Sequence, residues 1–161
     1  MYFEPSHRST WPLAFEKDWR LRFVKDPYAG LLRILSSRLD EKSMNEVLHD
    51  VGVHCANSWD QVRLHRGDFD GFCKVLKQSA SGDEVTWDSE KNVIHVASPE
   101  RTDCFCPLNG VRQNTPPLVC NCSLGWQQQA WETVLGKKVR VELKESVLRG
   151  GIRCVFEVHV A

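Results

Sequence analysis

The sequence predicts an α+β domain in which helices pack on an antiparallel sheet made of two β-hairpins. Apolar residues recur every three or four positions in residues 40–56 and 68–78, which is typical of amphipathic helices. Polar and apolar residues alternate in residues 84–97 and again in residues 139–160, which is typical of strands. The length of 161 residues is that of one ordinary domain.

Three helices are expected in this domain. The first begins near Asp40, because the apolar residues that follow it form one face of a helix. The second covers residues 68–78. The third covers Ser123–Leu135, with Ser123 as the N-cap and Gly136 as the residue that ends the helix.

Two hairpins are expected to supply the strands. The first joins residues 84–87 to residues 92–97 through a turn at residues 88–91. The second joins residues 139–144 to residues 152–160 around Arg149-Gly150-Gly151.

The chain divides into an arm and a domain. Residues 1–38 form an N-terminal arm with one short helix, because only residues 28–39 carry an apolar stripe. Residues 39–161 form the single α+β domain. The arm packs either on its own core or on a partner subunit, and the sequence leaves both open.

Composition excludes several classes of function. The 21 basic and 21 acidic residues give a formal charge of zero, so nucleic acid is not an expected partner. No apolar run approaches the length that spans a bilayer, and the N-terminus does not have the pattern of a secretory signal. We therefore expect a cytoplasmic protein without a membrane partner.

The cysteines carry most of the functional information. The chain has seven, and in a reducing compartment thiols persist as buried apolar groups, metal ligands or reactive groups. Residues 98–122 form a long connection without apolar periodicity, which is typical of a functional or disordered segment. Two Cys-x-Cys pairs bracket much of it, namely Cys104 with Cys106 and Cys120 with Cys122.

These four thiols predict a structural zinc site. Four thiolates suit a tetrahedral Zn²⁺ ion, which would fix the loop where no hydrophobic core can hold it. The chain must bend at each pair, because residues i and i+2 of an extended chain are about 6.6 Å apart. The N-terminus of the third helix favours negative charge on Cys120 and Cys122.

Two other interpretations of these cysteines stay open. The thiols are inert in one, as buried cysteines often are. In the other, the helix N-terminus lowers the pKa of Cys120 or Cys122, which then acts as a nucleophile with His95 as the candidate base. His95 shares the face of its strand with Val93 and Ala97, and a lone histidine among apolar residues is more typical of a structural histidine.

Four aromatic residues are candidates for the lining of a ligand cavity: Trp87, Trp126, Trp131 and Phe156. Aromatic residues on amphipathic elements are also ordinary core residues.

The C-terminal part of the chain resembles a known family. Residues 120–126 read CNCSLGW, residues 135–139 LGKKV, residues 146–151 SVLRGG and residues 154–158 CVFEV. These segments resemble the 4-vinyl reductase domain superfamily, and also small bacterial proteins described as L-2-amino-thiazoline-4-carboxylic acid hydrolase-like. The resemblance implies an antiparallel α+β domain, a cavity for a small hydrophobic or small organic ligand, and a homodimer.

The same resemblance implies a zinc site that this chain only partly retains. Two of the family's ligand positions match Cys120 and Cys154, whereas Leu143 and Ser146 stand at the other two. Cys154 is therefore a possible substitute for one of the four ligands at Cys104, Cys106, Cys120 and Cys122.

Three functions are compatible with these features. The first is a small-ligand-binding or sensor-type domain with a structural zinc site and no turnover. The second is a thiol-dependent hydrolase of a small cyclic amide or thiazoline-like substrate, which the resembling proteins suggest. The third is a dimerisation module with ordinary cysteines.

Overall fold

The computed structural model describes residues 27–28, 30–102, 104 and 117–161. Residues 30–38 are helical and lead into α2 (Glu41–Ser58), α3 (Asp60–Leu64) and α4 (Phe69–Gln78). The strands β1 (Glu84–Asp88) and β2 (Val93–Ala97) follow, and then the short helix η2 (Pro117–Cys120) and α5 (Asn121–Leu135). The chain ends with β3 (Val139–Glu145), η3 (Val147–Arg149) and β4 (Val155–Val160).

The four strands form one antiparallel sheet in the order β1-β2-β4-β3. Each predicted hairpin is present, and the pairing of β2 with β4 joins the two hairpins. The α+β prediction is therefore confirmed, including the antiparallel sheet with helices packed on it.

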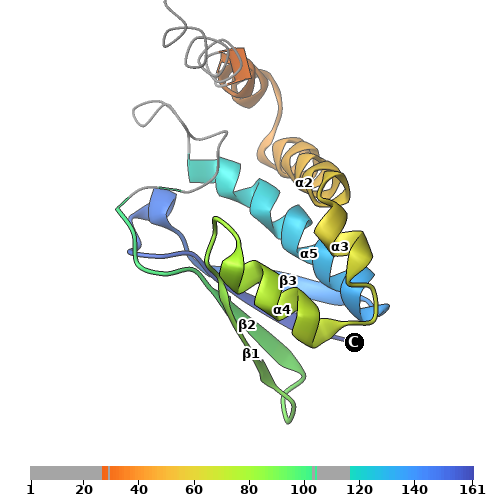
Figure 1. The fold of residues 1–161 in the computed structure, drawn as a ribbon. Helices are drawn as coiled ribbons and strands as arrows, with labels where there is room; N and C mark the ends of the chain where they lie inside the picture. Colours follow the sequence, from red (N-terminus) through yellow and green to blue (C-terminus); the bar gives the residue numbers. More distant parts are fainter. Residues whose placement is uncertain (1–26, 29, 103, 105–116) are drawn as a thin grey trace, which may run out of the picture.

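Helices cover one face of the sheet in two layers. Figure 1 shows α5 running beside α2, with the sheet on its other side, and α4 lying over the sheet next to β1. Strand alternation turns Ile94 and Val96 of β2 toward these helices, together with Phe156 and Val158 of β4. The main core consists of Val62, Phe72, Leu76, Ile94, Val96, Ala130, Trp131, Val134, Val139, Phe156 and Val158.

Local sequence explains where α2 and α4 begin. The Asp40 side chain accepts a hydrogen bond from the Ser43 N–H (2.8 Å), and Asp68 does the same for Gly71 (2.9 Å). Both predicted helices are confirmed.

The start of α5 was predicted wrongly. The helix begins at Asn121, two residues before the expected N-cap Ser123, because the helical turn of η2 continues directly into it. Its end is as predicted, with Gly136 in the left-handed conformation (φ 66°) that favours glycine.

A second buried cluster lies where the helix at residues 30–38 meets the first half of α2 and the start of α5. Leu32 from the helix at residues 30–38 packs there with Met44, Leu48, Val119 and Cys122. This part of the predicted arm therefore packs on its own chain, while residues 1–26 lie outside the described residues. Among the described helices, none is long and apolar enough to cross a membrane.

Candidate functional site: a thiol cluster at the start of α5

Three of the predicted site residues lie close together near the start of α5. Cys120 ends η2 and is buried, and its Sγ lies 3.3 Å from Ser146 Oγ at the end of β3. Cys154 precedes β4 and is held to the end of β2, because its N–H donates to Ser98 Oγ (3.0 Å) and its carbonyl accepts from the Ser98 N–H (2.9 Å). Cys104 interacts electrostatically with both. We call Cys104, Cys120 and Cys154 the thiol cluster.

The environment of this cluster favours neutral thiols. Burial raises the pKa of Cys120, and the nearby Cys104 raises it further, although the Ser146 hydroxyl and Arg149 act in the opposite direction. Burial also raises the pKa of Cys154, to which Cys104 and Cys120 add. For Cys120 this direction is opposite to the one expected from the helix N-terminus, because desolvation by burial is the largest effect on its pKa.

The structure separates Cys122 from Cys120. Cys122 lies in the first turn of α5 and packs with Leu32 and Met44 in the second buried cluster, whereas Cys120 contacts Ser146. Two residues of a helix differ in direction by about 200°, so Cys120 and Cys122 point to different sides of α5. Cys106 lies outside the described residues. The zinc site at Cys104, Cys106, Cys120 and Cys122, with Cys154 as the substitute ligand, stays a prediction. Among the described residues, the sulfurs of Cys104, Cys120 and Cys154 do not form a group within 4.8 Å of one another.

His95 does not join the thiol cluster. Its side chain lies on the face of β2 opposite to Ile94 and Val96, which pack on the helices. There its Nδ1 is 3.8 Å from Glu157 Oε1 of β4. The structure therefore does not bring His95 to Cys120 or Cys122 as a base.

The four aromatic residues predicted to line a cavity contact other side chains of the core. Trp131 is fully buried and its ring centroid is 5.2 Å from that of Phe72. Phe156 is also buried, and Trp126 packs on Trp59 with ring centroids 5.9 Å apart. Trp87 is 40% exposed and contacts Phe69. Their observed role is packing.

A groove of about 890 Å³ lies between the first half of α2 and the start of α5. Most of its lining residues are of polar or charged types, although their exposed surface in the groove is largely apolar: Glu41, Lys42, Asn45, Glu46, His49, Asp50, Asn121 and Leu124. Asn121 fixes one wall, because its Nδ2 donates to Asn45 Oδ1 (2.5 Å) and its Oδ1 accepts from Arg149 Nη2 (2.7 Å). Sequence reasoning missed this groove, since charged residues on the outer side of an amphipathic helix are typical of solvated surface.

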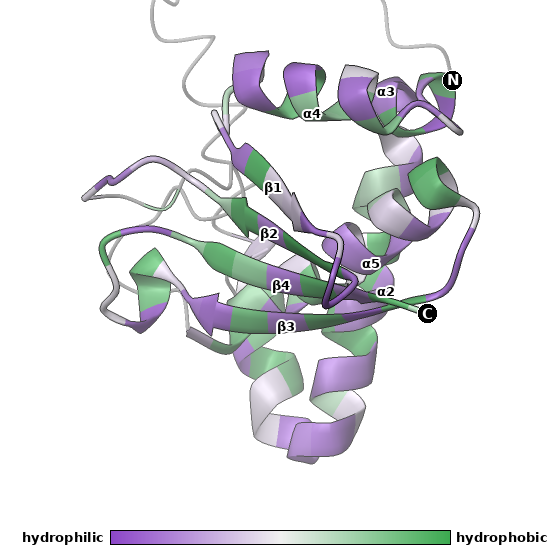
Figure 2. Ribbon diagram, turned by 90° about the horizontal axis from the view of Figure 1, so that it is seen from below, coloured by the Kyte–Doolittle hydropathy of each residue, from purple (hydrophilic) through white to green (hydrophobic). Residues whose placement is uncertain are grey.

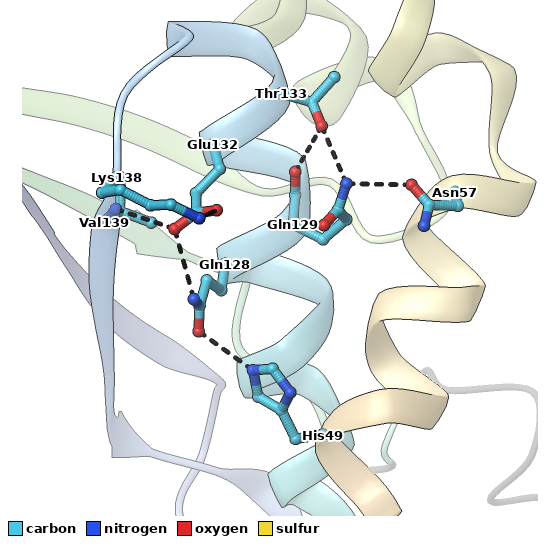
Figure 3. Close-up of polar contacts among 8 residues, drawn as sticks. All are labelled: His49, Asn57, Gln128, Gln129, Glu132, Thr133, Lys138 and Val139. Atoms are coloured by element: carbon cyan, nitrogen blue, oxygen red, sulfur yellow. Dashed lines mark hydrogen bonds and ion pairs between the residues drawn. The ribbon is translucent and has the colours of Figure 1, made fainter.

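Polar side chains connect this groove to the sheet (Figure 3). His49 Nε2 and Gln128 Oε1 are 3.0 Å apart, and Gln128 donates in turn to Glu132 Oε1 (3.3 Å). Glu132 also accepts from Lys138 Nζ (2.8 Å) and from the N–H of Val139 at the start of β3 (3.3 Å). The chain of contacts therefore holds α2, α5 and β3 in one arrangement.

Comparison with known proteins places the fold. No family model matches the chain, and no curated protein matches it. A solved structure does: subunit 3 of the trafficking protein particle complex from Naegleria fowleri, covalently bound to palmitic acid. The match has a TM-score of 0.59 at 17% identity and covers 89% of this chain and 96% of that chain. This chain shares the fold of that trafficking complex subunit.

A second similar structure belongs to the family that the sequence resembles. It is a vinyl-4-reductase family protein from Methanocaldococcus jannaschii, with a TM-score of 0.45 and 15% identity, covering 96% of this chain and 85% of that chain. The 4-vinyl reductase family is thus represented among the structures similar to this chain.

Proposed function

We propose that this chain is a small-ligand-binding domain that holds a hydrophobic acyl group as a thioester on Cys120. The observation that carries the proposal is the burial of Cys120 beside two other thiols, where an uncharged sulfur is favoured over a thiolate. The fold relative bound covalently to palmitic acid supports the class of ligand.

The chemistry of Cys120 favours retention of an acyl group over turnover. A thioester forms when the Cys120 sulfur, after losing its proton, attacks the carbonyl carbon of an activated acyl thioester and the donor's thiol leaves. The raised pKa keeps the thiolate population low, so this exchange is slow. Once formed, the protein thioester is neutral and suits a buried site. This combination fits a binding domain better than an enzyme.

The test is the intact mass of the purified full chain, before and after treatment with neutral hydroxylamine, which cleaves thioesters. We expect a fraction of the chain to carry an acyl mass that hydroxylamine removes, and Cys120→Ser to abolish it. Cys73→Ser is the matched control, because Cys73 lies on α4, outside the thiol cluster, and that variant should keep the adduct. An unmodified wild-type chain after incubation with palmitoyl-coenzyme A would contradict the proposal.

A structural zinc ion at the same cluster is the second candidate. Its support is electrostatic: Cys104 raises the pKa of both Cys120 and Cys154, although the three sulfurs do not form a group within 4.8 Å of one another. Elemental analysis should then find about one zinc per chain, lost in Cys104→Ser. Under the acyl proposal, Cys104→Ser keeps the adduct on Cys120, so the two candidates are distinguished. The thiol-dependent hydrolase is not carried forward, because the structure leaves Cys120 without His95 as a base.

Homodimerisation and cytoplasmic localisation stay predictions.

A further inference from the structure

The face of the sheet away from α5 carries a group of side chains that the proposed function does not use. Strand alternation places Glu142 of β3 on this face, together with Glu157 and His159 of β4. Glu142 lies directly opposite Glu157 in the register. Figure 2 looks onto the sheet with α2 and α5 behind it, so none of the described helices covers this face.

The Nε2 atom of His159 lies near the carboxylates of Glu142 and Glu157 without a hydrogen bond to either. Nε2 lies 3.6 Å from Glu142 Oε1 and 3.8 Å from Glu157 Oε2. It is buried and has no hydrogen-bond partner among the described residues, although the His159 side chain as a whole is 30% exposed. These distances exceed the usual range for a hydrogen bond. A buried ring nitrogen without a partner is costly and needs an explanation.

The same distances suit three ligands of one metal ion. Two ligand atoms that are each about 2.0–2.2 Å from a zinc ion, at the tetrahedral angle, lie roughly 3.3–3.6 Å from one another. The imidazole nitrogen and the two carboxylate oxygens all lie within 4.8 Å of one another. Small side-chain rotations therefore bring the three atoms onto one ion.

We propose that Glu142, Glu157 and His159 form a binding site for a divalent transition-metal ion of the Zn²⁺ class. One imidazole nitrogen with two carboxylates is a donor set that such ions accept, and three protein ligands leave one position open for water or an anionic ligand. This site is separate from the thiol cluster, because it lies on the opposite face of the sheet and contains no sulfur. It does not depend on the proposed function.

Lys144 is the competitor of the metal ion. Its Nζ lies 3.4 Å from Glu142 Oε2 and 3.3 Å from Glu157 Oε2, and Arg140 forms an ion pair with Glu142. A metal ion must displace the Lys144 ammonium. This displacement costs little free energy, because ion pairs on an exposed surface are weak.

The experiment is a titration of the full chain with Co²⁺, followed by visible absorption and by competition with Zn²⁺. Co²⁺ reports on its ligands, because thiolates give a charge-transfer band that nitrogen and oxygen ligands lack. We expect one Co²⁺ per chain with the ligand-field spectrum of a nitrogen and oxygen site. Any binding at the thiol cluster is recognised by its charge-transfer band and by its loss in Cys120→Ser.

Four variants decide the outcome. His159→Gln and Glu157→Gln should each weaken this Co²⁺ binding by about tenfold or more, as expected when a ligand is lost. His95→Gln should stay within about twofold of wild type, because His95 also faces Glu157 but is not one of the three ligands. Lys144→Gln keeps all three ligands and should tighten binding by roughly two- to tenfold.

Circular dichroism of each variant checks that the sheet is intact. Wild-type affinity in folded His159→Gln and Glu157→Gln overturns the proposal. If either variant fails to fold, Lys144→Gln decides, and unchanged affinity in that variant overturns the proposal as well. The proposal is also overturned if Co²⁺ gives only the charge-transfer band of thiolate ligands.

Discussion

Gly52 of α2 lies directly against the backbone of Cys122 in α5. A Cβ atom at Gly52 would come closer than 3.0 Å to the Cys122 carbonyl oxygen and to the Trp126 nitrogen, a separation that real Cβ atoms essentially never show. Gly125 of α5 makes the reciprocal contact, since a Cβ there would meet the His49 carbonyl of α2. Two glycines therefore allow the backbones of α2 and α5 to approach closely beside the groove that both helices line.

Replacement of Gly52 by alanine should destabilise the protein by several kcal/mol. The added methyl group meets backbone atoms that cannot rotate away, so α2 and α5 must separate and lose packing along their contact. Urea denaturation followed by circular dichroism measures the change in the free energy of unfolding.

Gly30→Ala is the matched control for this change. Gly30 is also helical, but nothing lies within 4 Å of a Cβ at that position. Alanine should therefore be neutral or stabilise by up to about 1 kcal/mol, because it is the better helix former. Equal losses in the two variants would contradict the close approach of α2 and α5.

The buried hydrogen bond between Trp131 and Gln127 inside α5 should stabilise the protein, and a double-mutant cycle measures its contribution to the free energy of unfolding. The Trp131 indole N–H donates to Gln127 Oε1 (2.8 Å), and both side chains are buried. Gln127→Leu leaves the indole N–H without this acceptor and should cost about 1–3 kcal/mol. In a Trp131→Phe background, which has no indole N–H, the same change should cost less. An identical cost in both backgrounds would show that the bond contributes nothing.

The elements that could be predicted from sequence are those fixed by local patterns. The side chains of Asp40 and Asp68 cap α2 and α4, and strand alternation defined both hairpins. The pairing of β2 with β4 joins residues far apart in the chain, and periodicity carries no signal for it. The early start of α5 was missed because the preceding turn of η2 has no apolar period of its own.

The candidate site was predictable in composition but not in geometry. Cys120 and Cys122 were treated as a pair, yet helical geometry turns them apart. Cys154 joins Cys104 and Cys120 only through the sheet, which holds it against Ser98. Desolvation of Cys120 depends on tertiary packing, so the direction of its pKa shift could not be obtained from the neighbouring sequence.

Glu132 should stabilise the protein in a pH-dependent way. Burial alone would raise the pKa of Glu132, but hydrogen bonds from Lys138, the Val139 N–H and Gln128 outweigh it and hold the pKa below the ordinary value of 4.5. A lowered pKa means that the stabilisation is present above the ordinary value and is lost as the pH falls through the folded-state value.

Glu132→Gln should therefore cost about 1–2 kcal/mol at pH 7, and less in acid. Denaturation of wild type and variant between pH 7 and about pH 3 gives this difference. Glu84→Gln is the control, because the ion pair of Glu84 with Lys77 is exposed and should contribute little. A difference between wild type and Glu132→Gln that stays constant with pH would argue against the lowered pKa.

Cys73 should make the protein less stable in alkali. Burial raises the pKa of the Cys73 thiol from the ordinary value of 9.0 to about 11, and the negative charges of Asp70 and Asp68 add to the effect. Between these two values the unfolded chain releases a proton that the folded chain retains, so the free energy of unfolding decreases as the pH rises. Cys73→Ala removes this group and should flatten the decrease between pH 9 and pH 11, measured by denaturation under reducing conditions.

Cys55→Ala removes a half-buried thiol from α2 and serves as the control. If the two variants show the same slope as wild type, the thiol of Cys73 titrates alike in the folded and unfolded chains, and its packing on α4 does not exclude the thiolate.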